Sequence, residues 1–224
     1  MNVKNVEQRS LSVSRVRNFV LICVTVCCLA IATGVLAQKP QLPPPDYFPL
    51  PIAAVWKYKT TSDAGTNTEF TQTVLKTESQ PDGTLLYLTQ ISSNSPQQTP
   101  IQTWYSKPPG WVMMHKMSYY LTEGSFQPVR PFLKNPLVPG TTWDWKGTGI
   151  VGEDISETSK VIALEDVVVP AGKYQAMKVI TNVNQTGSPV TKTYWYANHV
   201  GLVKSVTDSN GVQATSQLVS YTFP

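Results

Sequence analysis

The stretch that decides the fold runs from Val167 to Ser205 and reads VVVPAGKYQAMKVITNVNQTGSPVTKTYWYANHVGLVKS. Two β-prone runs follow the turn sequences Pro170-Ala171-Gly172 and Gly187-Ser188-Pro189, and a third begins after Asn198-His199-Val200-Gly201. Glycine and proline at these points break regular structure, and the runs between them are rich in β-branched and aromatic residues. The order predicts consecutive antiparallel hairpins, a β-meander.

The same pattern continues on both sides of this stretch. Strands are expected at 55–61, 68–79, 84–92, 101–106, 111–120, 141–149, 150–165 and 213–223. Asp82-Gly83 and Ser209-Asn210-Gly211 are hairpin turn signals. Residues 121–140 contain prolines at 128, 131, 136 and 139, which predicts a long crossing loop with at most a short edge strand. No window of sufficient length after residue 51 shows a convincing helical period free of proline and glycine.

The predicted class is therefore all-β: a single antiparallel meander domain over residues 52–224, with about ten to twelve strands. Such a chain avoids exposed edges by curling into a half-barrel or barrel, or by forming a two-sheet β-sandwich. Consecutive hairpins and the long runs 68–79 and 150–165 favour the curled sheet or half-barrel. The sandwich stays open as the alternative.

Residues 1–37 have the composition of a signal peptide. A basic region with Lys4, Arg9, Arg15 and Arg17 precedes the uncharged run FVLICVTVCCLAIATGVLA, which ends at Ala37. Cleavage there predicts an exported protein of the periplasm, cell surface or extracellular space. The alternative is an uncleaved membrane anchor over residues 19–37, because about 20 apolar residues span a bilayer. Residues 38–51 contain six prolines and are expected to form an extended tether.

Charge and cysteine content exclude several classes of activity. The chain has 18 basic and 14 acidic residues; without the leader's four basic residues and one acid, 14 and 13 remain, a net charge of +1. This balance gives no cationic surface for nucleic acid. Cys23, Cys27 and Cys28 all lie in the leader, so residues 38–224 cannot form disulfides or cysteine-ligated zinc sites. No cofactor fingerprint is present.

Three motifs carry a family resemblance. They are Trp56-x-Tyr58, Val169-Pro170-Ala171-Gly172-Lys173-Tyr174, and Trp195-Tyr196-Ala197 followed by Val200-Gly201-Leu202-Val203-Lys204. In this order they resemble an exported bacterial β-domain family of unknown function, similar in shape to the half-barrels that carry lipoproteins or lipids. The resemblance covers most of residues 38–224 and implies fold and export. It implies no catalytic residues, because its motifs are turn and packing motifs.

Candidate catalytic groups are sparse. The two histidines, His115 and His199, are far apart in sequence, and His199 lies in a predicted turn, where a solvated or turn-capping imidazole is expected. The acids Asp144, Glu153, Asp154 and Glu157 are expected to be charges on the outer face of the sheet. Neighbours such as Glu153 and Asp154 point to opposite faces of a strand, so they cannot form a local pair.

Aromatic pairs are the unusual feature of the composition. Trp143 and Trp145 share one strand face, as do Tyr194 and Tyr196, with Trp195 on the opposite face. Two interpretations remain: these rings pack the core, or they form an apolar lining for a lipid or glycan. All five residues are therefore candidates for ligand binding.

Three functions follow from these features. The first is a non-enzymatic envelope protein that binds a lipid, another apolar ligand or an envelope protein such as a lipoprotein. The second is a structural or adhesive surface module with a packed core. The third, an exported hydrolase, has the least support because no local nucleophile and base are visible. No cofactor or metal is expected, the membrane is involved only through an uncleaved leader, and nothing in the sequence predicts the oligomeric state.

Overall fold

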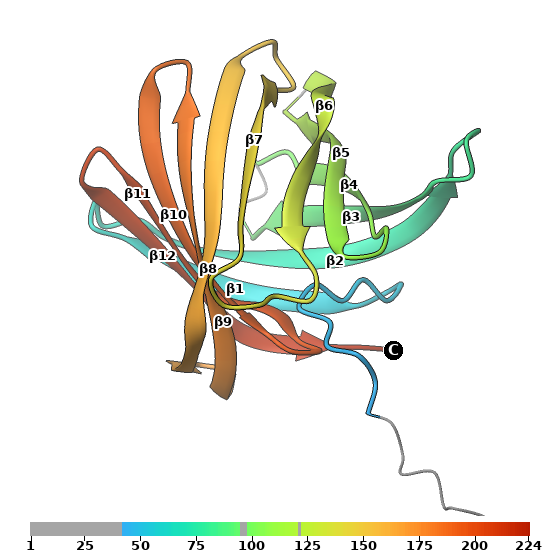
Figure 1. The fold of residues 1–224 in the computed structure, drawn as a ribbon. Coiled ribbons are helices and arrows are strands. Elements are labelled where there is room, and N and C mark those ends of the chain that lie inside the picture. The colour runs from blue at the N-terminus through green and yellow to red at the C-terminus, as the bar shows by residue number, and fades with distance from the viewer. Residues whose placement is uncertain (1–41, 95–97, 121) are drawn as a thin grey trace, which may run out of the picture. The chain divides into compact units, whose positions relative to one another are not determined.

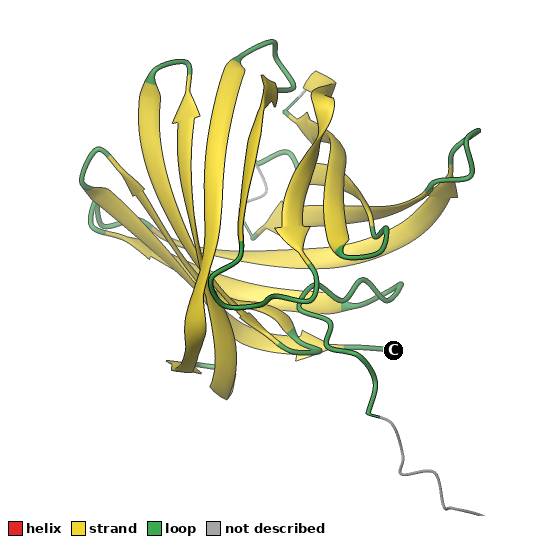
Figure 2. Cartoon of the chain, viewed as in Figure 1, coloured by secondary structure: helices red, strands yellow, loops and turns green. Residues whose placement is uncertain are grey.

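The computed structural model describes residues 42–94, 98–120 and 122–224, and these form strands and turns without a helix (Figures 1 and 2). The strands are β1 (Val55–Ser62), β2 (Asn67–Ser79), β3 (Leu85–Ser93), β4 (Ile101–Ser106), β5 (Trp111–Tyr119), β6 (Thr122–Lys134), β7 (Thr142–Thr148), β8 (Asp154–Val169), β9 (Gly172–Gln185), β10 (Ser188–Ala197), β11 (Gly201–Ser209) and β12 (Val212–Thr222). The expected all-β class is confirmed. No described helix is long and apolar enough to cross a membrane.

The strands close into a barrel in which each pairs antiparallel with its sequence neighbours. The first and last strands complete the ring, from Val55 opposite Thr222 to Ser62 opposite Ala214. The sheet is therefore more closed than the half-barrel favoured by the sequence, and it is one sheet rather than a sandwich. Closure pairs both ends of the meander and leaves no free edge at β1 or β12.

β6 corrects the interpretation of residues 121–140 as mainly loop. This strand pairs with β5 from Thr122 opposite Tyr119 to Lys134 opposite Trp111, with register shifts near its prolines. Its other edge meets β7 at a single pair, Gln127 opposite Thr148, and Figure 1 shows the ribbons of β6 and β7 set apart from each other. A strand with one largely unpaired edge tolerates proline, because the missing N–H groups need no partner there. We call this weak contact the β6–β7 seam.

Inward and outward side chains alternate along the strands, as the pleat requires. In β8, the residues from Ile155 to Val161 are buried at every second position. The inward residues join one large core cluster that extends around the barrel. A separate small cluster, Leu86, Leu88 and Trp104, lies apart from it.

The segment before β1 packs into one end of the barrel. Tyr47, Phe48 and Leu50 are buried, so this second half of the proline-rich stretch belongs to the compact unit that spans residues 44–224. We call residues 46–50 the plug. Figure 1 shows this blue segment beside the loop between β6 and β7. The predicted signal peptide, residues 1–37, and residues 38–41 of the predicted tether lie outside the described residues.

Asp46 fixes the plug to three separate parts of the barrel. Its carboxylate accepts hydrogen bonds from Lys107 Nζ at 2.7 Å and Asn135 Nδ2 at 2.7 Å. Its backbone N–H donates to Asn198 Oδ1 at 2.8 Å, and its carbonyl accepts from the backbone N–H of His199 at 2.7 Å. Burial opposes ionisation of Asp46, but the hydrogen bonds from Lys107 and Asn135 and the Lys107 charge outweigh it, so the pKa of Asp46 is lowered.

Candidate functional site

An aromatic cavity lies inside the barrel above the plug. Its volume is about 160 Å³, comparable to cavities that hold one benzene ring. Seven of its thirteen lining residues are aromatic: Phe48, Trp56, Tyr58, Tyr105, Phe132, Tyr194 and Tyr196. Gln72 is the one lining side chain with an amide, and no charged residue lines the cavity. Such a lining suits an apolar group the size of a ring or a short chain.

The plug forms one wall of this cavity. The ring of Phe48 lies 5.1 Å from Tyr105, 5.6 Å from Phe132 and 6.5 Å from Tyr196, measured between centroids. These separations are typical of attractive aromatic pairs. Gly201 lies next to the plug. It has a φ of +95°, and a Cβ there would lie 3.5 Å from the side chain of Pro49. The plug and the predicted turn before β11 therefore fit closely together.

Two tyrosine hydroxyls remain available at the cavity. Tyr58 Oη donates to the carbonyl of Leu202 at 2.9 Å. The hydroxyls of Tyr194 and Tyr196 make no hydrogen bond to any described residue, yet no fully buried polar side-chain atom of those residues lacks a partner. The two hydroxyls therefore face the open space of the cavity. Burial raises the pKa of Tyr194 to about 12 and that of Tyr196 well above its usual value, so both are neutral hydrogen-bonding groups at physiological pH.

Polarity rises from the cavity towards the far end of the barrel. Tyr194 of β10 pairs with Ser205 of β11, and Ser205 pairs with Ser216 of β12. Ser216 Oγ is 2.7 Å from Thr60 Oγ1 of β1. Lys192, with its strand partners Thr181 and Thr207, lies next to these hydroxyl groups on the side away from the plug. The interior is thus amphipathic, with rings at the plug and small polar side chains beyond them.

A buried ion pair beside the cavity links β6 to β8, the two neighbours of β7 in the barrel. Arg130 of β6 donates from Nε to Glu157 Oε2 at 2.7 Å and from Nη2 to Oε1 at 2.6 Å. Their side chains are 12% and 7% exposed. Arg130 also lies 5.7 Å from the ring of Phe132, which lines the cavity. The bidentate geometry satisfies both carboxylate oxygens, which is what a buried pair needs to be tolerated.

Lys192 of β10 is a second cation in the interior. It pairs with Thr181 of β9 and Thr207 of β11. It precedes Tyr194 and Tyr196 in the sequence at a spacing of two and shares their inward face. Its ammonium makes no hydrogen bond or ion pair to any described residue. Burial lowers the pKa of Lys192, and repulsion by Arg130 adds to this, whereas Glu157 opposes it. The three groups leave the interior with a net charge of +1.

The five aromatic residues singled out by the sequence lie in different places. Tyr194 and Tyr196 line the cavity. Trp143 and Trp145 point inward but are packed, at 8% and 6% exposure, with edge contacts to Trp111 and Phe126 respectively, and neither lines the cavity.

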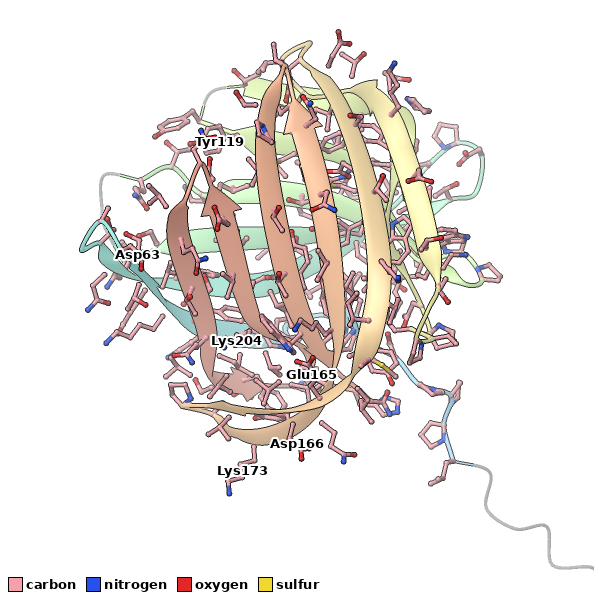
Figure 3. All side chains as sticks on the ribbon, turned by 60° about the vertical axis from the view of Figure 1, so that its left-hand side comes forward. Asp63, Tyr119, Glu165, Asp166, Lys173 and Lys204 are labelled. Carbon is pink, nitrogen blue, oxygen red and sulfur yellow. The ribbon has the colours of Figure 1, made fainter. Side chains whose placement is uncertain are left out.

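Trp195 points outward. Its Nε1 donates to Glu165 Oε2 at 2.8 Å, and Lys178 and Lys204 lie 5.4 and 4.9 Å from its ring. Glu165 and Lys204 are labelled on this outer face in Figure 3. The hydrogen bond from Trp195 lowers the pKa of Glu165, against the effect of burial, and Lys178 adds to the lowering.

The acidic candidates also differ in where their side chains lie. Asp144 and Asp154 are exposed as expected, and Glu153 binds the backbone N–H of Val151 in the β7–β8 turn. Glu157 corrects the expectation of an outer-face charge, because it points inward to Arg130. His199 is exposed in its turn, with a φ of +57°. No three His, Cys, Asp or Glu side chains of the described ranges gather as a metal site would require.

Folding brings together one nucleophile and base that the sequence did not reveal. Ser106 Oγ lies 2.8 Å from His115 Nε2. Ser106 is only 5% exposed, and neither ring nitrogen of His115 is hydrogen-bonded to a described carboxylate. Burial lowers the pKa of His115, although the charge of Asp82 opposes this. The pair has no orienting acid in contact, which a catalytic triad would contain.

Comparison with known proteins gives a fold relationship. No family model matches the chain, and no curated protein matches it. A putative lipoprotein of Parabacteroides distasonis is 16% identical, with a TM-score of 0.52 over 80% of this chain and 100% of the other. A putative exported protein of Bacteroides fragilis with a YmcC-like fold is 16% identical, with a TM-score of 0.51 over 80% of this chain and 99% of the other. This chain is therefore similar in fold to both proteins. The expected resemblance to exported bacterial β proteins is thus confirmed at the level of fold.

The important residues that the sequence did not single out are Arg130 and Lys192. Arg130 lies in the segment interpreted as loop, so its inward direction had no local signal. Lys192 had one, because it precedes Tyr194 and Tyr196 at the same spacing of two and must share their face. The barrel therefore has an interior site whose aromatic residues were partly predictable from the sequence and whose charged residues were not.

Proposed function

We propose that this protein is an exported, non-enzymatic envelope protein that holds an apolar ligand in the aromatic cavity of its barrel. The observation that carries the proposal is the cavity of about 160 Å³ lined by seven aromatic residues, with the hydroxyls of Tyr194 and Tyr196 open to it. A structural module gains nothing from leaving such a space unfilled, since an empty cavity lowers stability. Export is supported by the leader composition and by the exported proteins that share the fold.

The cavity limits the size of what it holds. A drug-sized ligand needs about 300–1,000 Å³, so the cavity takes a single ring or one short alkyl chain, and not a whole diacyl lipid. Only one short stretch of an acyl chain from an envelope lipid or lipoprotein would therefore fit into the cavity.

The test is binding of octanol, a neutral eight-carbon probe, to the full chain purified from cells, measured by calorimetry and by NMR. We expect saturable binding of one octanol per chain. Ile91 lines the cavity, so Ile91→Trp should fill the space and weaken binding at least tenfold. The matched control is Ile162→Trp on β8, where the side chain is 36% exposed, and it should bind as the wild type does.

Circular dichroism should show that both variants are folded. If folded wild-type protein gives no saturable binding, the packed structural or adhesive module becomes the better description. Equal binding by wild type and a folded Ile91→Trp variant would place the octanol elsewhere and overturn the proposed site.

A further inference from the structure

Lys192 is a half-buried cation on the inward face of the barrel, and it has no counterion among the described residues. Buried charges in proteins are normally paired, because removal from water is costly for an isolated ion. The acid that acts on Lys192 is Glu157, and both oxygens of Glu157 already accept hydrogen bonds from Arg130. No other described side chain bonds to the Lys192 ammonium. The interior therefore holds one positive charge more than its own residues neutralise.

The position of this charge relative to the cavity is specific. Tyr194 lines the cavity, and Lys192 is the next inward residue on β10, about 7 Å further along the strand at 3.4 Å per residue. The neighbouring inward residues are hydroxyls, with Thr181 paired to Lys192 and hydrogen-bonded to Ser159 at 2.9 Å. A polar environment for an anion thus adjoins an apolar environment for a chain.

We propose that the ligand is an anionic amphiphile, a short alkyl chain or single ring ending in a carboxylate, with its apolar part among the rings above the plug and its carboxylate at Lys192. This inference rests on the proposed function and adds the class of ligand to it. Arg130 contributes to the positive potential but remains bound to Glu157. The hydroxyls of Tyr194 and Tyr196 lie between the two parts of the site.

The experiment compares octanoate with octanol on the full chain at pH 7. The two probes share an eight-carbon chain and differ in the charge of the head group. We expect wild-type protein to bind octanoate at least tenfold more tightly than octanol. Lys192→Met keeps an unbranched side chain of similar length without the charge, so it should reduce this preference to less than threefold while leaving octanol binding unchanged.

The control variant is Lys178→Met, which removes a lysine from the outer face of the adjacent strand, 5.4 Å from Trp195. It should retain the full preference for octanoate. Equal affinities of wild-type protein for the two probes would overturn the inference and leave the proposed function intact. A Lys192→Met variant that loses octanol and octanoate in equal measure would also overturn it, because Lys192 would then act through the shape of the barrel. Failure of both probes to bind wild-type protein would remove the proposed function itself.

Discussion

At the scale of single residues, the Arg130–Glu157 pair has the largest expected energetic consequence. The side chains of Arg130 and Glu157 are 12% and 7% exposed, and two short hydrogen bonds join them. Removing one member of such a pair leaves the other as an uncompensated buried charge. Removing both members together avoids that cost.

We therefore expect Glu157→Gln to lower the free energy of unfolding by about 3–5 kcal/mol at pH 7. The double variant Arg130→Met with Glu157→Leu should recover most of this loss, because it leaves no buried charge from the pair. Urea unfolding of the three proteins measures the difference. A double variant as unstable as the single one would show that packing around Trp145 and Phe126, and not the charge, sets the cost.

At the scale of elements, the plug is an irregular segment held by a dense set of polar contacts. Asp46 accounts for most of them, through Lys107, Asn135, Asn198 and His199. Phe48 then places a ring in the cavity wall. Because the plug lies within the proline-rich stretch, its attachment decides whether residues 46–50 belong to the barrel or to the tether.

Asp46→Asn should lower the free energy of unfolding by about 1–3 kcal/mol at pH 7, the range for a hydrogen bond to a charged group. The pKa of Asp46 is lowered in the folded protein. Its contribution is therefore complete above the unfolded-state pKa of about 3.9, and it is lost as the pH falls through the lower folded-state pKa. Unfolding curves of wild type and variant should differ at pH 7 and converge at the acid end.

The matched control for this prediction is Asp166→Asn, an exposed acid on β8 labelled in Figure 3. It should change the free energy of unfolding by less than about 0.5 kcal/mol at either pH. A constant difference between wild type and Asp46→Asn from pH 7 to the acid end would show that the ionised carboxylate is not what holds the plug.

At the scale of the whole molecule, the barrel is closed but unevenly bonded. β8 and β9 pair from Ile155 opposite Gln185 to Val169 opposite Gly172, whereas the β6–β7 seam has one pair. Few backbone hydrogen bonds cross the seam, so it should open at lower free energy than the rest of the ring.

Hydrogen exchange should detect this difference directly. We expect amides of β8 and β9 bonded to each other to exchange slowest, with free energies of opening close to that of global unfolding. Amides of β6 and β7 that face the seam should exchange at least 100-fold faster, as expected of locally opening structure. Protection across the seam equal to that of β8 and β9 would contradict an uneven barrel.

Much of this architecture could be read from the residues. The turn at Ser209-Asn210-Gly211 has positive φ at Asn210 and Gly211, as an Asn-Gly hairpin requires, and twelve strands fall within the expected number. The inward direction of Tyr194 and Tyr196 followed from their spacing of two. These features are local, because turn chemistry and pleat direction depend on residues within a few positions of one another.

Tertiary structure decided the rest: closure between β1 and β12, the strand formed by residues 122–134, the plug, and the meeting of Arg130 with Glu157. Closure depends on the twist and stagger accumulated over all twelve strands, which no single segment encodes. β6 tolerates prolines because β7, its neighbour across the seam, pairs with it at one position only. The sequence of β6 alone does not reveal how β7 pairs. The charges in the interior could not be predicted for the same reason. Which side chains lie together inside the barrel is determined only when the barrel closes.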